Sequence, residues 1–66
     1  MRQTLYAVVR PDGTVIECEP GSCREFSLWN ALEHDERLRR IVKRNSTGNV
    51  SNARRVGYDF MEITDG

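Results

Sequence analysis

The chain has 66 residues, of which 38% are hydrophobic and 30% are charged. This composition is typical of a folded protein, and the length suits one small domain, so we expect residues 1–66 to form a single domain. A core of this size leaves little room for a deep substrate cleft. No stretch has the length or hydrophobicity of a membrane span, and the absence of a signal peptide predicts a cytoplasmic protein.

The segment Leu5–Cys18 predicts a β-hairpin with a three-residue loop. Pro11 and Asp12 favour a type I turn, and Gly13 suits the left-handed position that closes such a loop. Val9 then lies opposite Val15, and Val8 opposite Ile16. We expect one face to turn toward the core, formed by Tyr6, Val8, Ile16 and Cys18. The other face retains Leu5, Val9 and Val15.

Two cysteines and one histidine are too few for a four-ligand zinc site. Cys18 and Cys23 stand on either side of a Pro-Gly turn, and a protein without an export signal keeps such thiols reduced. We therefore expect two free thiols, no metal and no cofactor.

Two signals compete for the start of the helix that follows. Ser22-Cys23-Arg24-Glu25 matches a capping box, and Ser27 offers a second cap. We expect an irregular start near Ser22 and a firm helix from about Leu28. Its apolar stripe combines residues at helical spacing: Leu28, Ala31, Leu32, Leu38 and Val42. Trp29 flanks this stripe, and we expect it in the core, with a recognition anchor as the alternative.

Asp35 interrupts the apolar stripe. Either the helix breaks there and Asp35 caps a second helix, or the helix continues and Asp35 contacts an arginine at the rim of the sheet. We favour the continuous helix, because Glu33–Arg37 and Glu36–Arg40 are favourable pairs that would bridge the break.

Asn45 and Gly48 are natural helix terminators, and residues 45–52 predict a polar loop. A helical turn near residues 51–56, capped by Ser51 and with Gly57 in the left-handed exit, is followed by a last strand over 58–63. The two faces of that strand, Tyr58 with Phe60 and Met61 with Ile63, are both apolar. The predicted fold is α+β, with a three-stranded antiparallel sheet packed against one main helix in the order β-β-α-β. The last strand should lie beside the first.

Basic residues are concentrated between residues 37 and 55, where seven bases occur without an acid. Such a run can bind a phosphate backbone or an acidic protein surface. A plainer interpretation is a solvated helix face that complements the helix dipole. The isoelectric point of about 6.6 is low for a dedicated nucleic-acid-binding domain. The candidate partner-binding residues in this run are Arg37, Arg40, Arg44, Arg54 and Arg55.

The uncovered sheet face is a second candidate surface. Leu5, Val9 and Val15 could contact a partner or a second copy of the chain, or could simply reflect β-propensity. The acidic residues between 12 and 36 could imitate a DNA surface, or be ordinary solvated side chains. The sequence shows neither a nucleophile elbow nor a phosphate-binding loop, so we do not expect an enzyme.

Tyr6–Glu17, the tryptophan-containing helix and Gly57–Ile63 together resemble small accessory proteins of phages and mobile elements. Those proteins open with a hairpin, cross with one helix and close with a strand after an Arg-Arg-x-Gly turn, as at Arg54, Arg55 and Gly57. The resemblance implies an inhibitor of the anti-CRISPR type, which occludes a surface without chemistry in the cytoplasm of a host cell.

Our leading hypothesis is therefore a small non-enzymatic protein-interaction module that binds a host protein or ribonucleoprotein complex. A nucleic-acid-binding regulator that uses the same bases is the first alternative. A structural subunit that forms a homodimer through Leu5, Val9 and Val15 is the second.

Overall fold

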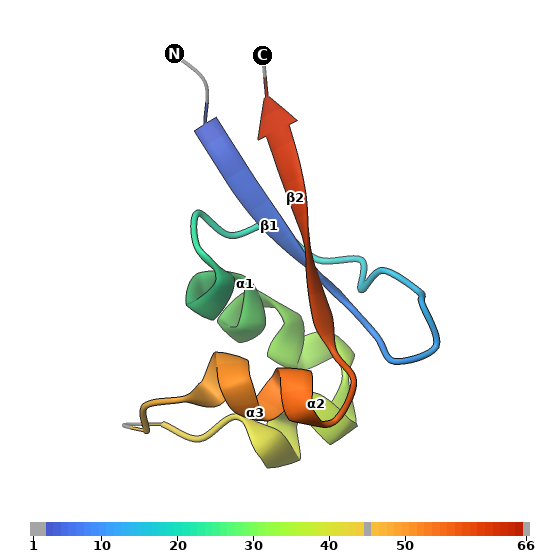
Figure 1. Ribbon diagram of the computed structural model, residues 1–66, viewed down its shortest axis with the longest axis vertical. Coiled ribbons are helices and arrows are strands. Elements are labelled where there is room, and N and C mark those ends of the chain that lie inside the picture. The colour runs from blue at the N-terminus through green and yellow to red at the C-terminus, as the bar shows by residue number, and fades with distance from the viewer. Residues whose placement is uncertain (1–2, 45, 66) are drawn as a thin grey trace.

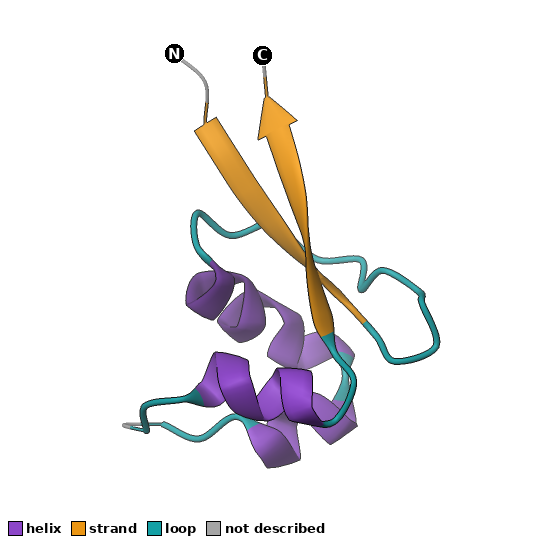
Figure 2. Cartoon of the chain, viewed as in Figure 1, coloured by secondary structure: helices purple, strands orange, loops and turns teal. Residues whose placement is uncertain are grey.

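The computed structural model describes residues 3–44 and 46–65. Two strands, β1 (Gln3–Val9) and β2 (Asp59–Asp65), enclose all the helical segments in the chain order. These segments are α1 (Arg24–Ala31), the 3-10 turn η1 (Leu32–His34), α2 (Glu36–Ile41) and α3 (Asn49–Arg55). The strands form a twisted ribbon, and its end that carries the termini projects beyond the helices (Figure 1, Figure 2). The fold is α+β, as predicted.

The sheet has two strands among the described residues, so the predicted three-stranded sheet is wrong. The predicted last strand does lie antiparallel beside the first, with Val8 opposite Phe60. The segment expected as the middle strand contacts β1 only through isolated bridges at Val15 and Gly21. The Cys18 N–H donates to the Ile16 carbonyl at 3.0 Å, and this tight local bond turns the chain away from β1 before a ladder can form.

The predicted turn at residues 11–13 is confirmed. The Arg10 N–H donates to the Thr14 carbonyl at 2.7 Å, and the Gly13 N–H donates to the Arg10 carbonyl at 2.9 Å. Gly13 has a φ of 91°, in the left-handed region that the loop requires. Val9 and Val15 are bridged as expected, so the turn sets the local register even though the second strand does not continue.

The core lies between one face of the ribbon and the helices. The predicted inward residues Val8 and Ile16 are fully buried, and Cys18 packs against the core. The predicted helical stripe is also found there: Leu28, Ala31, Leu38 and Val42 are buried, and Leu32 is partly buried. Ala53 and Tyr58 complete this cluster. The hydrophobic pattern therefore predicted these strand and stripe positions correctly, although the elements that carry them differ from the prediction.

Helix α1 begins at Arg24, earlier than the predicted firm start near Leu28. Its N-cap is Cys23 rather than Ser22 or Ser27: the Cys23 sulfur accepts a hydrogen bond from the Phe26 N–H at 3.4 Å. Ser27 is instead buried inside the helix, where its hydroxyl donates to the Arg24 carbonyl at 2.7 Å. Gly21 is buried directly against the Ser27 backbone and allows this close approach of α1.

The predicted continuous helix is wrong, because the chain leaves helical geometry at Asp35. Asp35 has extended φ and ψ angles of −151° and 110°, and its carboxylate caps α2 by accepting from the Leu38 N–H at 3.0 Å. The predicted pairs Glu33–Arg37 and Glu36–Arg40 do not form in the described part of the chain, where the ion pairs are Arg10–Asp35 and Arg24–Glu62. A buried N-cap outweighs two exposed helical pairs worth a few tenths of a kcal/mol each.

The predicted turn at residues 51–56 extends into a helix, α3, which begins at Asn49 within the segment expected as a loop. The N-cap of α3 is Gly48, and no side chain caps this helix, so the predicted Ser51 cap is wrong. The predicted terminator Asn45 lies outside the described residues. Gly57 has the predicted left-handed exit, with a φ of 104°. Trp29 was expected in the core but is 37% exposed, so that prediction is wrong.

Candidate interaction surfaces

The five predicted arginines lie on, or directly after, one pair of packed helices. Arg37 and Arg40 belong to α2, Arg44 follows it, and Arg54 and Arg55 form the last turn of α3. Helices α2 and α3 contact each other at the end of the molecule opposite the termini (Figure 1). All five side chains are exposed. We call this group, together with the exposed bases Arg39 and Lys43, the basic end.

Ion pairs within residues 3–44 and 46–65 do not neutralise the charges of the basic end. None of its seven bases takes part in an ion pair among the described residues. Arg54 instead lies over the Phe60 ring, with its guanidinium carbon 5.5 Å from the ring centroid. Because several bases occupy the last turns of α2 and α3, part of their charge complements the helix dipoles. The rest of the positive potential is directed toward solvent.

A buried asparagine holds the basic loop against α3. The Asn49 side chain is 3% exposed, accepts from the Lys43 N–H at 3.2 Å and donates to the Lys43 carbonyl at 3.1 Å. It also donates to the Ser46 carbonyl at 3.4 Å. These bonds fix the chain just before Arg44 relative to the helix that carries Arg54. No local pattern predicts this role, because Asn49 stands within a generally polar segment.

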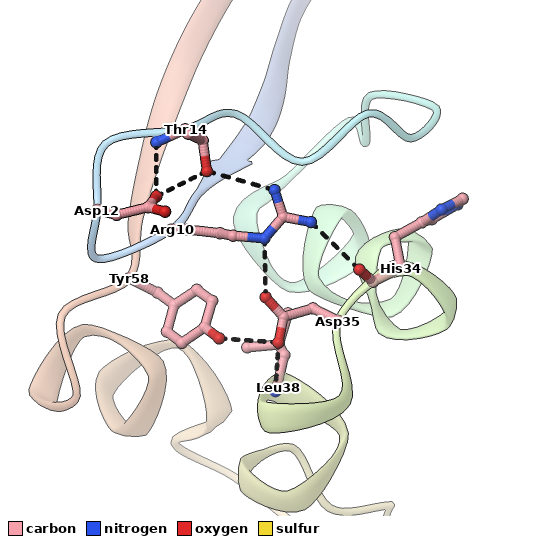
Figure 3. A network of polar contacts seen from close by, with 7 residues as sticks. All are labelled: Arg10, Asp12, Thr14, His34, Asp35, Leu38 and Tyr58. Atoms are coloured by element: carbon pink, nitrogen blue, oxygen red, sulfur yellow. Dashed lines mark hydrogen bonds and ion pairs between the residues drawn. The ribbon is translucent and has the colours of Figure 1, made fainter.

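Asp35 fixes the orientation of α2 (Figure 3). Besides the Leu38 N–H, its carboxylate accepts from Arg10 Nε at 3.2 Å and from the Tyr58 hydroxyl at 2.9 Å. Arg10 also donates to the His34 carbonyl at 3.2 Å. The predicted contact between Asp35 and an arginine of the sheet is therefore confirmed, and it coexists with the cap. One carboxylate ties the end of β1, the start of α2 and the start of β2 together.

The contacts of this network shift the pKa values of Asp35 and Tyr58. Burial raises the pKa of Asp35, but the hydrogen bonds from Leu38, Tyr58 and Arg10 and the charge of Arg10 outweigh it, so the pKa is lowered overall. Burial, with the adjacent Asp35 carboxylate, raises the pKa of Tyr58 to about 12. Both groups therefore keep the ionisation states that the network requires at neutral pH.

The apolar candidates lie on the other face of the ribbon. Because Val8 and Phe60 face the helices, their neighbours along each strand turn to the opposite side. Leu5 pairs with Ile63, and Val9 is bridged to Val15, so these residues share that side. The sequence did not show which face of the last strand is buried. In the structure Phe60 packs toward the core, and Met61 and Ile63 lie on the outward side. We call Leu5, Val9, Val15, Met61 and Ile63 the outer sheet face.

The structure thus separates the predicted binding residues into two groups. Leu5, Val9 and Val15 lie on the outer sheet face. The five arginines lie away from it: four belong to α2 and α3, and Arg44 follows α2. Met61, which is 42% exposed, is the main outward residue that periodicity alone left unassigned. A flat partner surface can contact either the outer sheet face or the arginines, but not both at once.

Cys18 and Cys23 are both free thiols, as predicted. In the described part of the chain, no three histidine, cysteine, aspartate or glutamate side chains are grouped closely enough to hold a metal ion. None of the described helices has the length and hydrophobicity needed to cross a membrane. Comparison of the chain with protein-family models, curated proteins and solved structures found no match.

Proposed function

We propose that the protein is a small interaction module that binds an acidic surface of a larger host protein or ribonucleoprotein complex through its basic end. The observation that carries this proposal is the exposure of seven bases without ion-pair partners in the described chain, five of them on the packed helices α2 and α3 and two in the loop that follows α2. Uncompensated charge of one sign raises the rate of encounter with a surface of the opposite sign and disfavours partners of the same sign.

Hydrogen bonds that anchor the basic end support a specific role for these charges. Asp35 anchors the start of α2, and Asn49 anchors the loop that leads into α3. The side chains of the basic end therefore project from backbone that is already ordered, which lowers the entropy lost on binding. A solvated surface needs no such anchoring.

The resemblance to phage accessory proteins gives the proposal its particular form. In that form, the protein occludes a surface of a host nucleoprotein machine of the CRISPR type, and its effect requires binding alone. Arginine is well suited to such a surface, because its planar guanidinium group binds carboxylates and phosphates in a bidentate manner.

A charge-reversal experiment tests this proposal. The tagged wild type, Arg40→Glu/Arg44→Glu and the charge-conserving control Arg40→Lys/Arg44→Lys would be used to capture partners from a bacterial lysate. We expect one stoichiometric partner that the wild type and the lysine variant retain and the glutamate variant loses. Identical sets of captured proteins for all three variants would contradict the proposal.

The same experiment separates a nucleic-acid-binding regulator from a protein-binding module. The seven unpaired bases would also suit a phosphate backbone. Treating the lysate with nuclease leaves a direct protein contact intact but removes a partner that is bridged by nucleic acid. Loss of capture after nuclease treatment, together with steep weakening of binding by salt, would favour the regulator.

A further inference from the structure

The exposed Trp29 side chain is among the residues that line a hollow in the surface. The hollow lies between the loop before α1 and the junction of α1 with η1, and its lining residues are Glu19, Trp29, Asn30, Glu33 and His34. A tryptophan in a chain of this size is normally needed in the core, and this one is 37% exposed. The core forms without it, which leaves the indole available for another contact.

The walls of this hollow are held together by a specific bond. The Asn30 side-chain amide donates to the Glu19 carbonyl at 3.0 Å and ties the loop to α1. Trp29 and Asn30 lie on α1, and Glu33 lies on η1, so the lining comes from ordered elements. Neither Glu19 nor Glu33 forms an ion pair within residues 3–44 and 46–65. The two carboxylates and the indole therefore line one hollow, and no ion pair among the described residues occupies either carboxylate.

This combination of groups is complementary to a cation. The face of an indole attracts an ammonium or guanidinium group through its quadrupole, and nearby carboxylates add direct charge attraction. We propose that the Trp29 hollow binds a lysine or arginine side chain of a basic peptide segment in a partner protein, with the cation seated against Trp29 between Glu19 and Glu33.

The shape of the surface points to a peptide segment rather than a single amine. A second hollow adjoins the first at His34 and is lined by Arg10, Val15, Glu17 and His34. Arg10 is already paired with Asp35, so Glu17 adds a third free carboxylate along the same path. The His34 ring points away from the Asp35 network (Figure 3). We call the two hollows, which share His34 and carry three carboxylates beside the paired Arg10, the acidic track. Several carboxylates in neighbouring hollows suit an extended chain with more than one basic residue.

This site is independent of the basic end. It carries the opposite charge, it is built from α1, η1 and the loop before them, and it uses none of the seven bases. The Arg40→Glu/Arg44→Glu variant should therefore bind a basic peptide as well as the wild type does. Failure of either proposal leaves the other intact.

Trp29 is the only tryptophan in the chain, so its fluorescence reports directly on occupation of the hollow. Hexalysine would be titrated into the wild type, with hexaglutamine as the uncharged control. We expect a saturable change in fluorescence with hexalysine and none with hexaglutamine. Glu19→Gln and Glu33→Gln should each weaken the binding of hexalysine about threefold to fivefold, the range of one exposed charge contact.

Glu25→Gln is the matched control, because Glu25 is an exposed glutamate on α1 outside the hollow. We expect its affinity for hexalysine to equal that of the wild type. An equal loss in all three variants would show general attraction between charges and overturn the site, as would the absence of any response to hexalysine. Equal binding of free lysine amide at the same lysine concentration would overturn the assignment of a peptide segment.

Discussion

Asp35 shows how one residue can satisfy two structural demands. In the sequence it was an acid inside an apolar stripe, and in the structure its side chain is 8% exposed and accepts from Leu38, Arg10 and Tyr58. Removing its charge leaves the Arg10 guanidinium partly buried without a counterion. A hydrogen bond to a charged group is worth roughly 1.5–3 kcal/mol, and the partial exposure of Arg10 reduces this gain.

Asp35→Asn should therefore lower the free energy of unfolding by about 2 kcal/mol, measured by urea denaturation at pH 7. Glu36→Gln removes an adjacent exposed carboxylate and should change it by less than about 0.5 kcal/mol. Because folding lowers the pKa of Asp35, its contribution is present above the unfolded value near 4 and is lost at more acid pH. The gap between wild type and Asp35→Asn should therefore narrow below about pH 4, and a gap independent of pH would contradict this assignment.

The contribution of Tyr58 to folding stability depends on pH in the opposite direction from that of Asp35. Its pKa is raised to about 12, above the unfolded value near 10, so its stabilising contribution is complete below pH 10 and is lost as the pH rises toward 12. Absorbance at 295 nm should show a tyrosine that ionises near pH 12 in the wild type. Tyr58→Phe should remove that step, and its survival in the variant would show that Tyr58 is not the group concerned.

At the scale of elements, the start of α1 depends on a weak cap. A thiol is a poor hydrogen-bond acceptor, and the Cys23 sulfur accepts from the Phe26 N–H at 3.4 Å. Cys23→Ser places a better acceptor at the same position. It should raise the free energy of unfolding by about 0.5 kcal/mol in thermal or urea denaturation. A loss of stability on this substitution would mean that the sulfur contributes packing that the hydroxyl cannot replace.

The contact between α1 and β1 depends on Gly21. A Cβ at this position would overlap the Ser27 backbone, and the Gly21 N–H and carbonyl both bond to Tyr6. Gly21→Ala should lower the free energy of unfolding by about 3 kcal/mol, at the upper end of overpacking costs. Gly13→Ala is the control: its Cβ meets open space, and only its φ of 91° opposes the substitution, for about 1–2 kcal/mol. Equal losses in the two variants would contradict the close approach of α1.

The sequence predicted the features that depend on local signals. The turn at residues 11–13, the left-handed Gly57 and the buried positions of the helical stripe follow from turn chemistry and periodicity, and the structure confirms them. The predicted middle strand failed because a ladder needs a partner along its whole length, and Ile16 and Cys18 turn the chain away after one bridge. The local sequence pattern does not indicate whether this segment continues to pair with β1 or turns away from it.

The break at Asp35 was one of two alternatives that the sequence left open. The choice between them depends on Arg10 and Tyr58, which approach Asp35 from 25 and 23 residues away. The candidate residues likewise fall into those that local sequence predicts and those that depend on distant contacts. The arginines were predicted as a group from their spacing, whereas the exposure of Trp29 and the role of Asn49 arise only from tertiary packing.

At the scale of the whole molecule, zero net charge conceals two surfaces of opposite sign. The basic end lies on α2 and α3, and the acidic track runs past Trp29 along α1 and η1. The outer sheet face is a third, apolar surface on the far side of the ribbon. Such a division allows a small chain to bind dissimilar partner surfaces without one site inhibiting the other.

The central claim is that the basic end is the surface that binds the host partner. Amide hydrogen exchange of the chain, free and in complex with the partner that it captures, tests this claim most directly. We expect binding to slow exchange in residues 37–44 and 53–55 and to leave β2 unchanged. Slower exchange confined to the two strands, with the helices unaffected, would contradict the account.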